Sequence, residues 1–129
     1  MRFMLDANTC IHLLADAFPA LTAQFLAQES GTVCVSSVAF AEIALGSHNG
    51  KPPPMDVLDA FVAEVPLVPF DANAARAYAG LPFKRGNFDR LIAAHALSLG
   101  LTVITRNTKD FSDVPGLKVE NWMIDASDA

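Results

Sequence analysis

Residues 89–105 read DRLIAAHALSLGLTVIT, and this stretch decides the fold. We expect a helix over residues 87–99 that ends at Gly100, because glycine readily takes the left-handed conformation that closes a helix. Leu101 to Thr105 is short, apolar and rich in β-branched residues, which predicts a buried strand. A helix that returns through one glycine into a buried strand is typical of α/β proteins with parallel sheets.

Strands and helices alternate along the rest of the chain as well. Further strands are expected at residues 2–5, 32–35, 67–70 and 117–119. Further helices are expected after Asn8 or Thr9 as a cap, over residues 18–30, after the Ser36-Ser37 cap, and over 55–65 and 72–79, with a loop at 46–54. This order predicts a single α/β domain over residues 1–129, with three layers and a parallel central sheet flanked by helices.

The composition is that of a globular protein. Hydrophobic residues make up 52% of the 129 residues and charged residues 18%, which excludes a disordered chain. No apolar stretch approaches the ~20 residues of a membrane span, and the N-terminus lacks the pattern of a signal peptide. Cys10 and Cys34 form no metal-binding motif and are expected to be free thiols. We therefore expect a cytoplasmic protein without membrane association.

The charge is acidic overall but unevenly distributed. A net charge of −5 argues against binding of duplex DNA by bulk electrostatics. Most of the basic residues nevertheless fall in the second half of the chain: Arg76, Lys84, Arg85, Arg90, Arg106 and Lys109. Arg85, Arg90 and Arg106 are candidates for a basic rim around a phosphodiester substrate. The same residues could equally form an ordinary solvated surface, so the sequence leaves both interpretations open, the basic rim and the plain surface.

Several carboxylates lie within or beside apolar segments, where an unpaired charge is costly. Asp6 follows the first strand, and Glu42 lies in an apolar helical stretch. Asp89 lies at the start of a helix, and Asn107 and Asp110 follow the clearest strand. No lysine or arginine recurs at a matching spacing beside them, so we expect a divalent cation to be their partner.

A parallel sheet can bring these residues to one edge, because ligands bind beyond the carboxyl ends of its strands. Hard oxygen donors of this kind suit Mg²⁺, for which Mn²⁺ can substitute. Asp6 and Asp89 are expected to be direct metal ligands, and Glu42 a ligand or the residue that orients an attacking water. Asn107 is expected to be a neutral supporting ligand, with Asp110 serving if Asn107 does not reach. Such an ion makes a bound water nucleophilic.

Most of these residues also have a purely structural explanation. Asp6 could be an N-cap acceptor, and Asp89 could complement a helix dipole. Asn107 and Asp110 could be turn residues. Glu42 is harder to explain in this way because its neighbours are apolar. The conjunction of all five therefore favours a site.

Histidine and the aromatic residues are expected to have packing roles. His95 lies six residues after Asp89, on a different face of the same helix, so packing is a better explanation for it than catalysis. Trp122 and the phenylalanines are spread through core-like segments rather than lined up to stack on bases.

Five segments carry a family resemblance: residues 4–8 (MLDAN), 36–42 (SSVAFAE), 88–97 (FDRLIAAHAL), 105–111 (TRNTKDF) and 114–122 (VPGLKVENW). Together they resemble PIN-domain proteins, and among these the VapC-type toxins of bacterial toxin–antitoxin pairs. The resemblance covers nearly the whole chain. It implies a Mg²⁺-dependent endoribonuclease that cleaves RNA, forms a homodimer and is held inactive by a VapB-type antitoxin.

The same resemblance implies roles for individual residues. Asp6, Glu42 and Asp89 match the three acids of the family. Asn107 stands where the family has Asp or Asn, and Asp110 matches the acid of its Asp-Phe ending. Because Asn107 is an amide, the site carries one charge fewer. The remaining candidates are the supporting residues Asn8 and Thr105 and the RNA-binding rim at Arg85, Arg90 and Arg106.

Two alternatives remain. A receiver-type phosphorylation domain has a similar length and a Mg²⁺-binding acidic pocket, with Asp71 as phosphoacceptor and Thr105 after the fourth strand. It would need paired acids after the first strand, where this chain has only Asp6, and it has no use for Glu42 or Asp89. The second alternative is a catalytically inactive PIN-like binding module, which the presence of all three acids disfavours.

Overall fold

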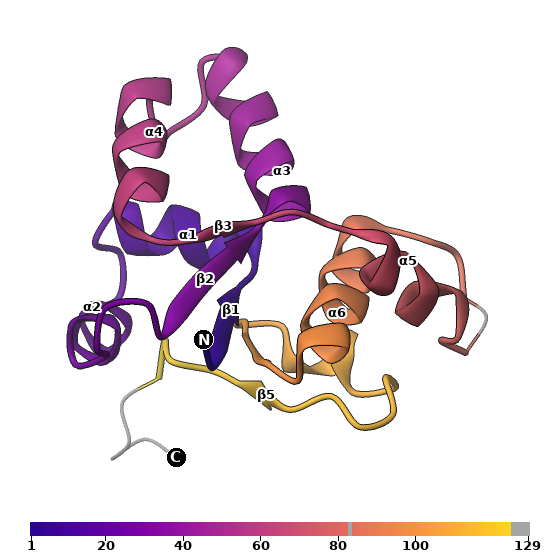
Figure 1. Ribbon diagram of the computed structural model, residues 1–129. Coiled ribbons are helices and arrows are strands. Elements are labelled where there is room, and N and C mark those ends of the chain that lie inside the picture. The colour runs from indigo at the N-terminus through magenta and orange to yellow at the C-terminus, as the bar shows by residue number, and fades with distance from the viewer. Residues whose placement is uncertain (83, 125–129) are drawn as a thin grey trace.

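The structure is a computed structural model that describes residues 1–82 and 84–124. At its centre is a five-stranded sheet in the order β3-β2-β1-β4-β5, in which every neighbouring pair is parallel (Figure 1). The strands are β1 (Phe3–Leu5), β2 (Val33–Ser36), β3 (Leu67–Val68), β4 (Thr102–Ile104) and β5 (Val119–Glu120). The predicted parallel α/β architecture is therefore confirmed.

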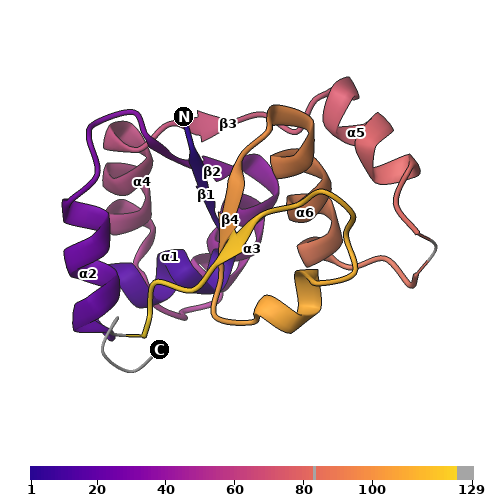
Figure 2. The ribbon, with the colours of Figure 1, turned by 90° about the horizontal axis from the view of Figure 1, so that it is seen from below.

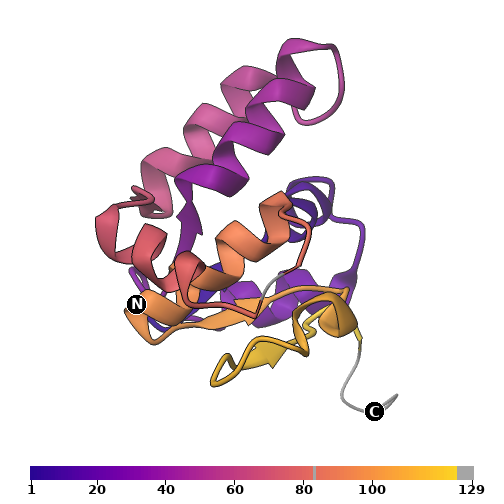
Figure 3. The ribbon, with the colours of Figure 1, turned by 90° about the vertical axis from the view of Figure 1, so that its right-hand side faces the viewer.

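Helices flank this sheet. They are α1 (Ala7–Leu14), α2 (Pro19–Leu26), α3 (Ser37–His48), α4 (Met55–Glu64), α5 (Ala72–Ala79), α6 (Phe88–Leu99) and the short 3₁₀ helix η1 (Thr108–Phe111). Figure 2 shows α1 and α2 on one side of the sheet and α5 and α6 on the other. In Figure 3, α3 and α4 run side by side and project beyond the sheet. Among the described residues no single helix is long and apolar enough to span a membrane, and α1 and α2, which reach that length together, are bent by 97°.

The central position of β1 follows from its burial. Phe3, Met4 and Leu5 are all at most 6% exposed, so this strand without alternation packs on both faces. Trp122, which follows β5, lies edge-on against Phe3 with ring centroids 4.9 Å apart. The predicted packing role of Trp122 is therefore confirmed.

Caps set the ends of several helices. α1 begins after Asp6, whose Oδ1 accepts a 2.8 Å hydrogen bond from the N–H of Thr9. The prediction that Asn8 or Thr9 caps this helix was wrong, because both already lie in its first turn. Asp71 caps α5 through the N–H of Ala74, and Gly100 ends α6 at a φ of 68°, both as predicted.

Two boundaries differ from those expected. The helix predicted over residues 18–30 ends at Leu26, because the chain turns toward β2 through Gly31, which has a φ of 85°. α3 instead continues to His48, beyond the expected start of the loop at residue 46. The hydroxyl of Ser47 lies 2.6 Å from the carbonyl of Pro53, to which it donates, and 3.1 Å from that of Ile43, which holds the last turn of α3 against the loop.

Candidate active site

The candidate site lies at the sheet edge where β1, β2 and β4 end. Asp6 directly follows β1 and is only 4% exposed. Its N–H donates a 3.2 Å hydrogen bond to the carbonyl of Ile104, the last residue of β4. The hydroxyl of Thr9 donates to the same carbonyl at 3.0 Å. These bonds fix Asp6 between the two central strands, at the edge that the parallel topology predicts.

The capping role of Asp6 uses only one of its two oxygens. Oδ1 accepts from the N–H of Thr9. Among the described residues Oδ2 takes part in no hydrogen bond. The structural and functional explanations of Asp6 are therefore compatible, because a carboxylate can cap a helix with one oxygen and bind a cation with the other.

Glu42 has the most unusual surroundings of the three acids. It lies in the second turn of α3, and its Oε1 is buried without a hydrogen-bond partner among the described residues. Burial, followed by the negative charges of Asp89 and Asp6, raises the pKa of Glu42 to about 7. A buried carboxylate oxygen without a partner is costly, so this position favours a proton or a bound cation.

Asp89 lies in the first turn of α6 and belongs to the same electrostatic cluster. Asn87 caps this helix through the N–H of Arg90 at 2.9 Å, so Asp89 is not needed as a cap. Burial raises the pKa of Asp89, and the charges of Asp6 and Asp110 raise it further. Burial and the neighbouring acids together therefore outweigh the stabilisation that a helix N-terminus gives to a carboxylate.

Asp110 is the acid of η1 whose charge reaches Asp89. Asn107 precedes η1 and is exposed, and its N–H donates to the buried hydroxyl of Thr105 at 3.1 Å. Thr105 therefore shapes the turn after β4. The choice between Asn107 and Asp110 as the fourth oxygen donor stays a prediction, and the charge coupling supports Asp110.

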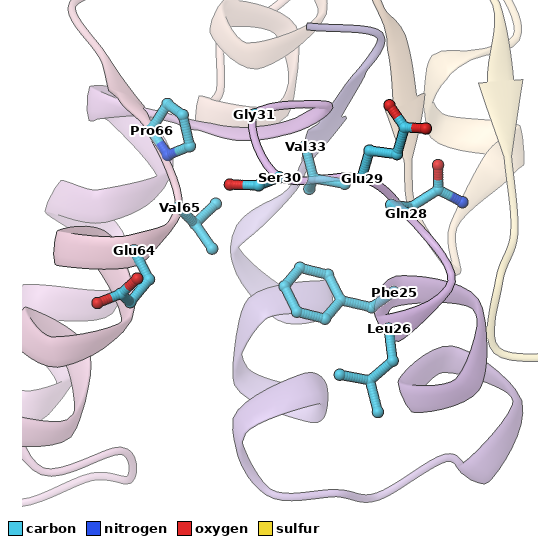
Figure 4. A pocket seen from close by; sticks show the side chains of 10 residues that line it. All are labelled: Phe25, Leu26, Gln28, Glu29, Ser30, Gly31, Val33, Glu64, Val65 and Pro66. Atoms are coloured by element: carbon cyan, nitrogen blue, oxygen red, sulfur yellow. The ribbon is translucent and has the colours of Figure 1, made fainter.

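A cavity of about 510 Å³ lies between α1, α3 and the loop that follows α3. Glu42, the exposed Asn8 and Lys51 of the loop all line this cavity. Asn8 thus lines the same cavity as Glu42, and its supporting role stays a prediction. A second cavity, of about 250 Å³, lies at the opposite edge of the sheet between Phe25, Val33 and Val65 (Figure 4). None of the candidate site residues lines it.

The three arginines of the predicted rim differ in their surroundings. Arg85 and Arg106 are exposed, and the guanidinium of Arg106 lies over the ring of Phe18 at 5.3 Å. Arg90 is only 5% exposed and binds Asp113 and the carbonyl of Pro82. The prediction that Arg90 lies on an RNA-binding rim was therefore wrong, because its guanidinium is held inside the protein.

The donor set fits a hard divalent cation that keeps part of its water shell. The groups at the site are carboxylates with one amide nearby, the ligands that Mg²⁺ and Mn²⁺ prefer. In the part of the chain that the structure describes, no three His, Cys, Asp or Glu side chains lie close enough together to hold a metal ion between them. Mg²⁺ typically binds through one or two carboxylates and several waters, so an open arrangement of acids suits it.

His95 is buried and has a packing role, as predicted. Its Nδ1 lies 2.8 Å from the hydroxyl of Ser36, and its ring lies edge-on to Phe70. Ser36 caps α3 by accepting from the N–H of Val38. Sequence reasoning missed this contact between α6 and the start of α3, because residues 59 positions apart give no local signal.

Comparisons with known proteins identify the family. The model of the PIN domain matches residues 3–117. The chain belongs to the PIN-domain family. It is also 35% identical over 133 residues to the tRNA(fMet)-specific endonuclease VapC of Shigella flexneri. The match covers 95% of this chain and 98% of that protein. The chain is therefore a PIN domain of the VapC type.

Two solved structures resemble this PIN domain closely. One is VapBC2 from Rickettsia felis bound to a DNA fragment from their promoter, with a TM-score of 0.80 and 28% identity, covering 95% of this chain and 99% of that one. The other is DNA-bound VapBC from Salmonella typhimurium, with a TM-score of 0.80 and 29% identity, covering 95% and 98%. The fold is therefore that of VapC subunits in VapBC complexes.

The receiver-type alternative does not fit this PIN domain. Asp71, its phosphoacceptor, follows the edge strand β3, and β2 lies between β3 and the central strand β1. Its Oδ1 accepts from the N–H of Ala74 at the start of α5. Asp71 is therefore a helix cap at a distance from Asp6, and the acids that cluster with Asp6 are Glu42 and Asp89.

Proposed function

We propose that this chain is an endoribonuclease toxin that hydrolyses RNA phosphodiester bonds with Mg²⁺, or Mn²⁺ in its place, at Asp6, Glu42 and Asp89. The observation that carries the proposal is the buried Oε1 of Glu42, which has no partner among the described residues and faces the charges of two further acids. Such a cluster is stable only when a proton or a cation offsets it. In a VapC-type PIN domain, a divalent cation at this cluster of acids would both offset their charge and support catalysis.

The position of each side chain suggests its role. Asp6 is held through Oδ1 and presents Oδ2, and Asp89 presents its carboxylate from the first turn of α6, so these two would hold the ion. Once bound, the ion would activate water and offset charge on the phosphate. Glu42, whose pKa is raised to about 7, would orient the attacking water and accept its proton. Asp110 or Asn107 adds a fourth oxygen donor.

The substrate follows from the relatives and from the exposed cations. Arg85 and Arg106 are exposed and can contact the phosphates of an RNA strand. The Shigella flexneri relative is named as specific for tRNA(fMet). We propose initiator tRNA as the first substrate to test for this chain.

The solved relatives also suggest partners. Because they are VapBC complexes, we propose that a VapB-type antitoxin binds this chain and covers the carboxylates. We also propose a homodimer, since Leu26 at the end of α2 is 73% exposed and an apolar helix surface suits a second copy. The buried free thiols Cys10 and Cys34 suit a reducing cytoplasm.

Cleavage of a defined RNA tests the proposal. The purified chain should cut tRNA in Mg²⁺ and lose this activity in EDTA, and Asp89→Asn should abolish cutting. Asp71→Asn is the matched control, because it removes a carboxylate outside the site and asparagine still caps α5. Metal-independent cutting would contradict the mechanism. Absence of cutting by the parent, with antitoxin binding intact, would favour the inactive binding module.

A further inference from the structure

Arg90 is a buried cation next to a site acid. Its guanidinium donates through Nη2 to the carbonyl of Pro82 at 2.8 Å and through Nη1 to Oδ2 of Asp113 at 3.1 Å. Only 5% of its side chain is exposed. A buried guanidinium is tolerated only when it is paired in this way. The pair therefore joins three segments: the loop before α6, the first turn of α6, and the turn after η1.

Asp113 binds two cations, but unequally. Lys84 reaches Oδ2 of Asp113 at 3.0 Å, with 59% of its side chain exposed. An exposed ion pair of this kind is screened by water and contributes little. The hydrogen bond from Lys84 lowers the pKa of Asp113 more than that from Arg90 does, but Lys84 is exposed, whereas Arg90 is buried and joins separate segments. Lys84 therefore offers a control for the charge around Asp113.

The Arg90–Asp113 pair joins the two segments that carry Asp89 and Asp110. Arg90 directly follows Asp89 in α6, and Asp113 lies three residues after Asp110 of η1. α6 and η1 are in contact, and the charge of Asp110 reaches Asp89. Binding Arg90 to Asp113 thus fixes the start of α6 against the end of η1.

The same pair engages the guanidinium of the residue that follows Asp89. Side chains at successive helix positions point in different directions, so Arg90 extends toward Asp113 while Asp89 belongs to the acid cluster. Without Asp113, the guanidinium beside Asp89 would be free to form charge-assisted hydrogen bonds with site carboxylates. It would then compete with a divalent cation for them.

We propose that Asp113 is a positioning residue of the active site, which binds Arg90 and thereby sets Asp89 against Asp110 and leaves the carboxylates free for a metal ion. This inference rests on the proposed function. In this proposal Asp113 acts through Arg90, so its loss should act on metal affinity as outer-shell partners do, by about 10- to 100-fold.

Manganese binding tests the inference without depending on catalysis. Calorimetric titration of Mn²⁺ into the parent, Asp113→Asn, Asp113→Glu and Lys84→Ala should give about tenfold or greater weakening in Asp113→Asn. Asp113→Glu should recover much of the affinity, and Lys84→Ala should stay within about twofold of the parent. The Mg²⁺ concentration needed for half-maximal RNA cleavage should shift in the same order.

Parent-like Mn²⁺ affinity in Asp113→Asn would overturn the inference, as would equal weakening by Lys84→Ala. Should Asp113→Asn not fold, Arg90→Lys takes its place, because lysine keeps the charge but lacks the two nitrogens through which Arg90 reaches Pro82 and Asp113 separately. Parent-like affinity in Arg90→Lys would then count against the proposal. A parent that neither binds Mn²⁺ nor cleaves RNA would refute the proposed function itself, which is a distinct result.

Discussion

The N–H of Thr9 donates a 2.8 Å hydrogen bond to Oδ1 of Asp6, so one carboxylate both begins α1 and faces the acid cluster. Because asparagine caps helices about as well as aspartate, Asp6→Asn should preserve the cap while removing the charge. We expect its melting temperature in EDTA to equal or exceed that of the parent, and its RNA cleavage to be lost.

Asp6→Ala is the matched comparison for this prediction. It removes both the charge and the cap, and should cost about 0.5–2 kcal/mol of stability relative to Asp6→Asn. Thermal unfolding in EDTA measures the difference. A clear loss of stability in Asp6→Asn would mean that Asp6 is structural alone and that repulsion among the acids is negligible.

The raised pKa of Glu42 predicts a pH-dependent stability in the absence of metal. Burial and two neighbouring acids move this pKa from 4.5 to about 7, so the neutral carboxyl is the form that suits the fold. Its stabilising contribution is fully present at low pH and is lost as pH rises through about 7. Glu42→Gln cannot ionise, so it should not show this loss.

Melting curves in EDTA between about pH 5 and about pH 8 test this prediction. The parent should lose stability relative to Glu42→Gln across that range, and added Mg²⁺ should reduce the difference. If the melting temperatures of the two proteins changed with pH in parallel, Glu42 would ionise normally, without influence from the charges of Asp89 and Asp6.

His95 predicts the opposite pH dependence. Burial lowers its pKa below the ordinary 6.5, while Asp71 and the Pro69 backbone oppose this shift. The neutral imidazole is therefore the form that suits the fold, so its stabilising contribution is present above about pH 6.5 and is lost as pH falls. His95→Asn keeps an acceptor near Nδ1 and cannot protonate, so its unfolding free energy should depend less on acid than that of the parent.

Exposed cations should affect RNA binding rather than folding. Arg106→Gln should weaken binding of an uncleaved RNA and make binding less dependent on salt, because one phosphate contact is lost. Arg76→Gln is the control, since Arg76 is exposed on α5, where it donates to Asn73. Fluorescence anisotropy at several salt concentrations measures both. Equal salt dependence in Arg106→Gln and the parent would remove Arg106 from the RNA-binding surface.

Local sequence signals predicted much of the fold. Gly100 ends α6, Asp71 caps α5, and the unalternating strand β1 is buried in the middle of the sheet. Each of these features depends on a few neighbouring residues. The order of strands along the chain then fixed the edge at which Asp6 lies.

Features that depend on distant partners could not be predicted. Arg90 resembles a surface cation in sequence, but its partner Asp113 is 23 residues away and buries it. The end of α2 depends on where the chain must enter β2, which no local pattern reveals. The candidate carboxylates could be identified because an unpaired charge in an apolar segment is energetically unfavourable, and such segments are visible in the sequence. The distances between these carboxylates depend on how α3, α6 and η1 pack, which the sequence does not reveal.

The central claim is that Asp6 and Asp89 hold a divalent cation beside Glu42. The most direct test is anomalous diffraction from a crystal of the protein soaked in Mn²⁺. The account predicts a manganese peak bounded by oxygens of Asp6 and Asp89, with Glu42 bound directly or through water. Ordered side chains with no peak among them, at Mn²⁺ concentrations that support RNA cleavage, would contradict it.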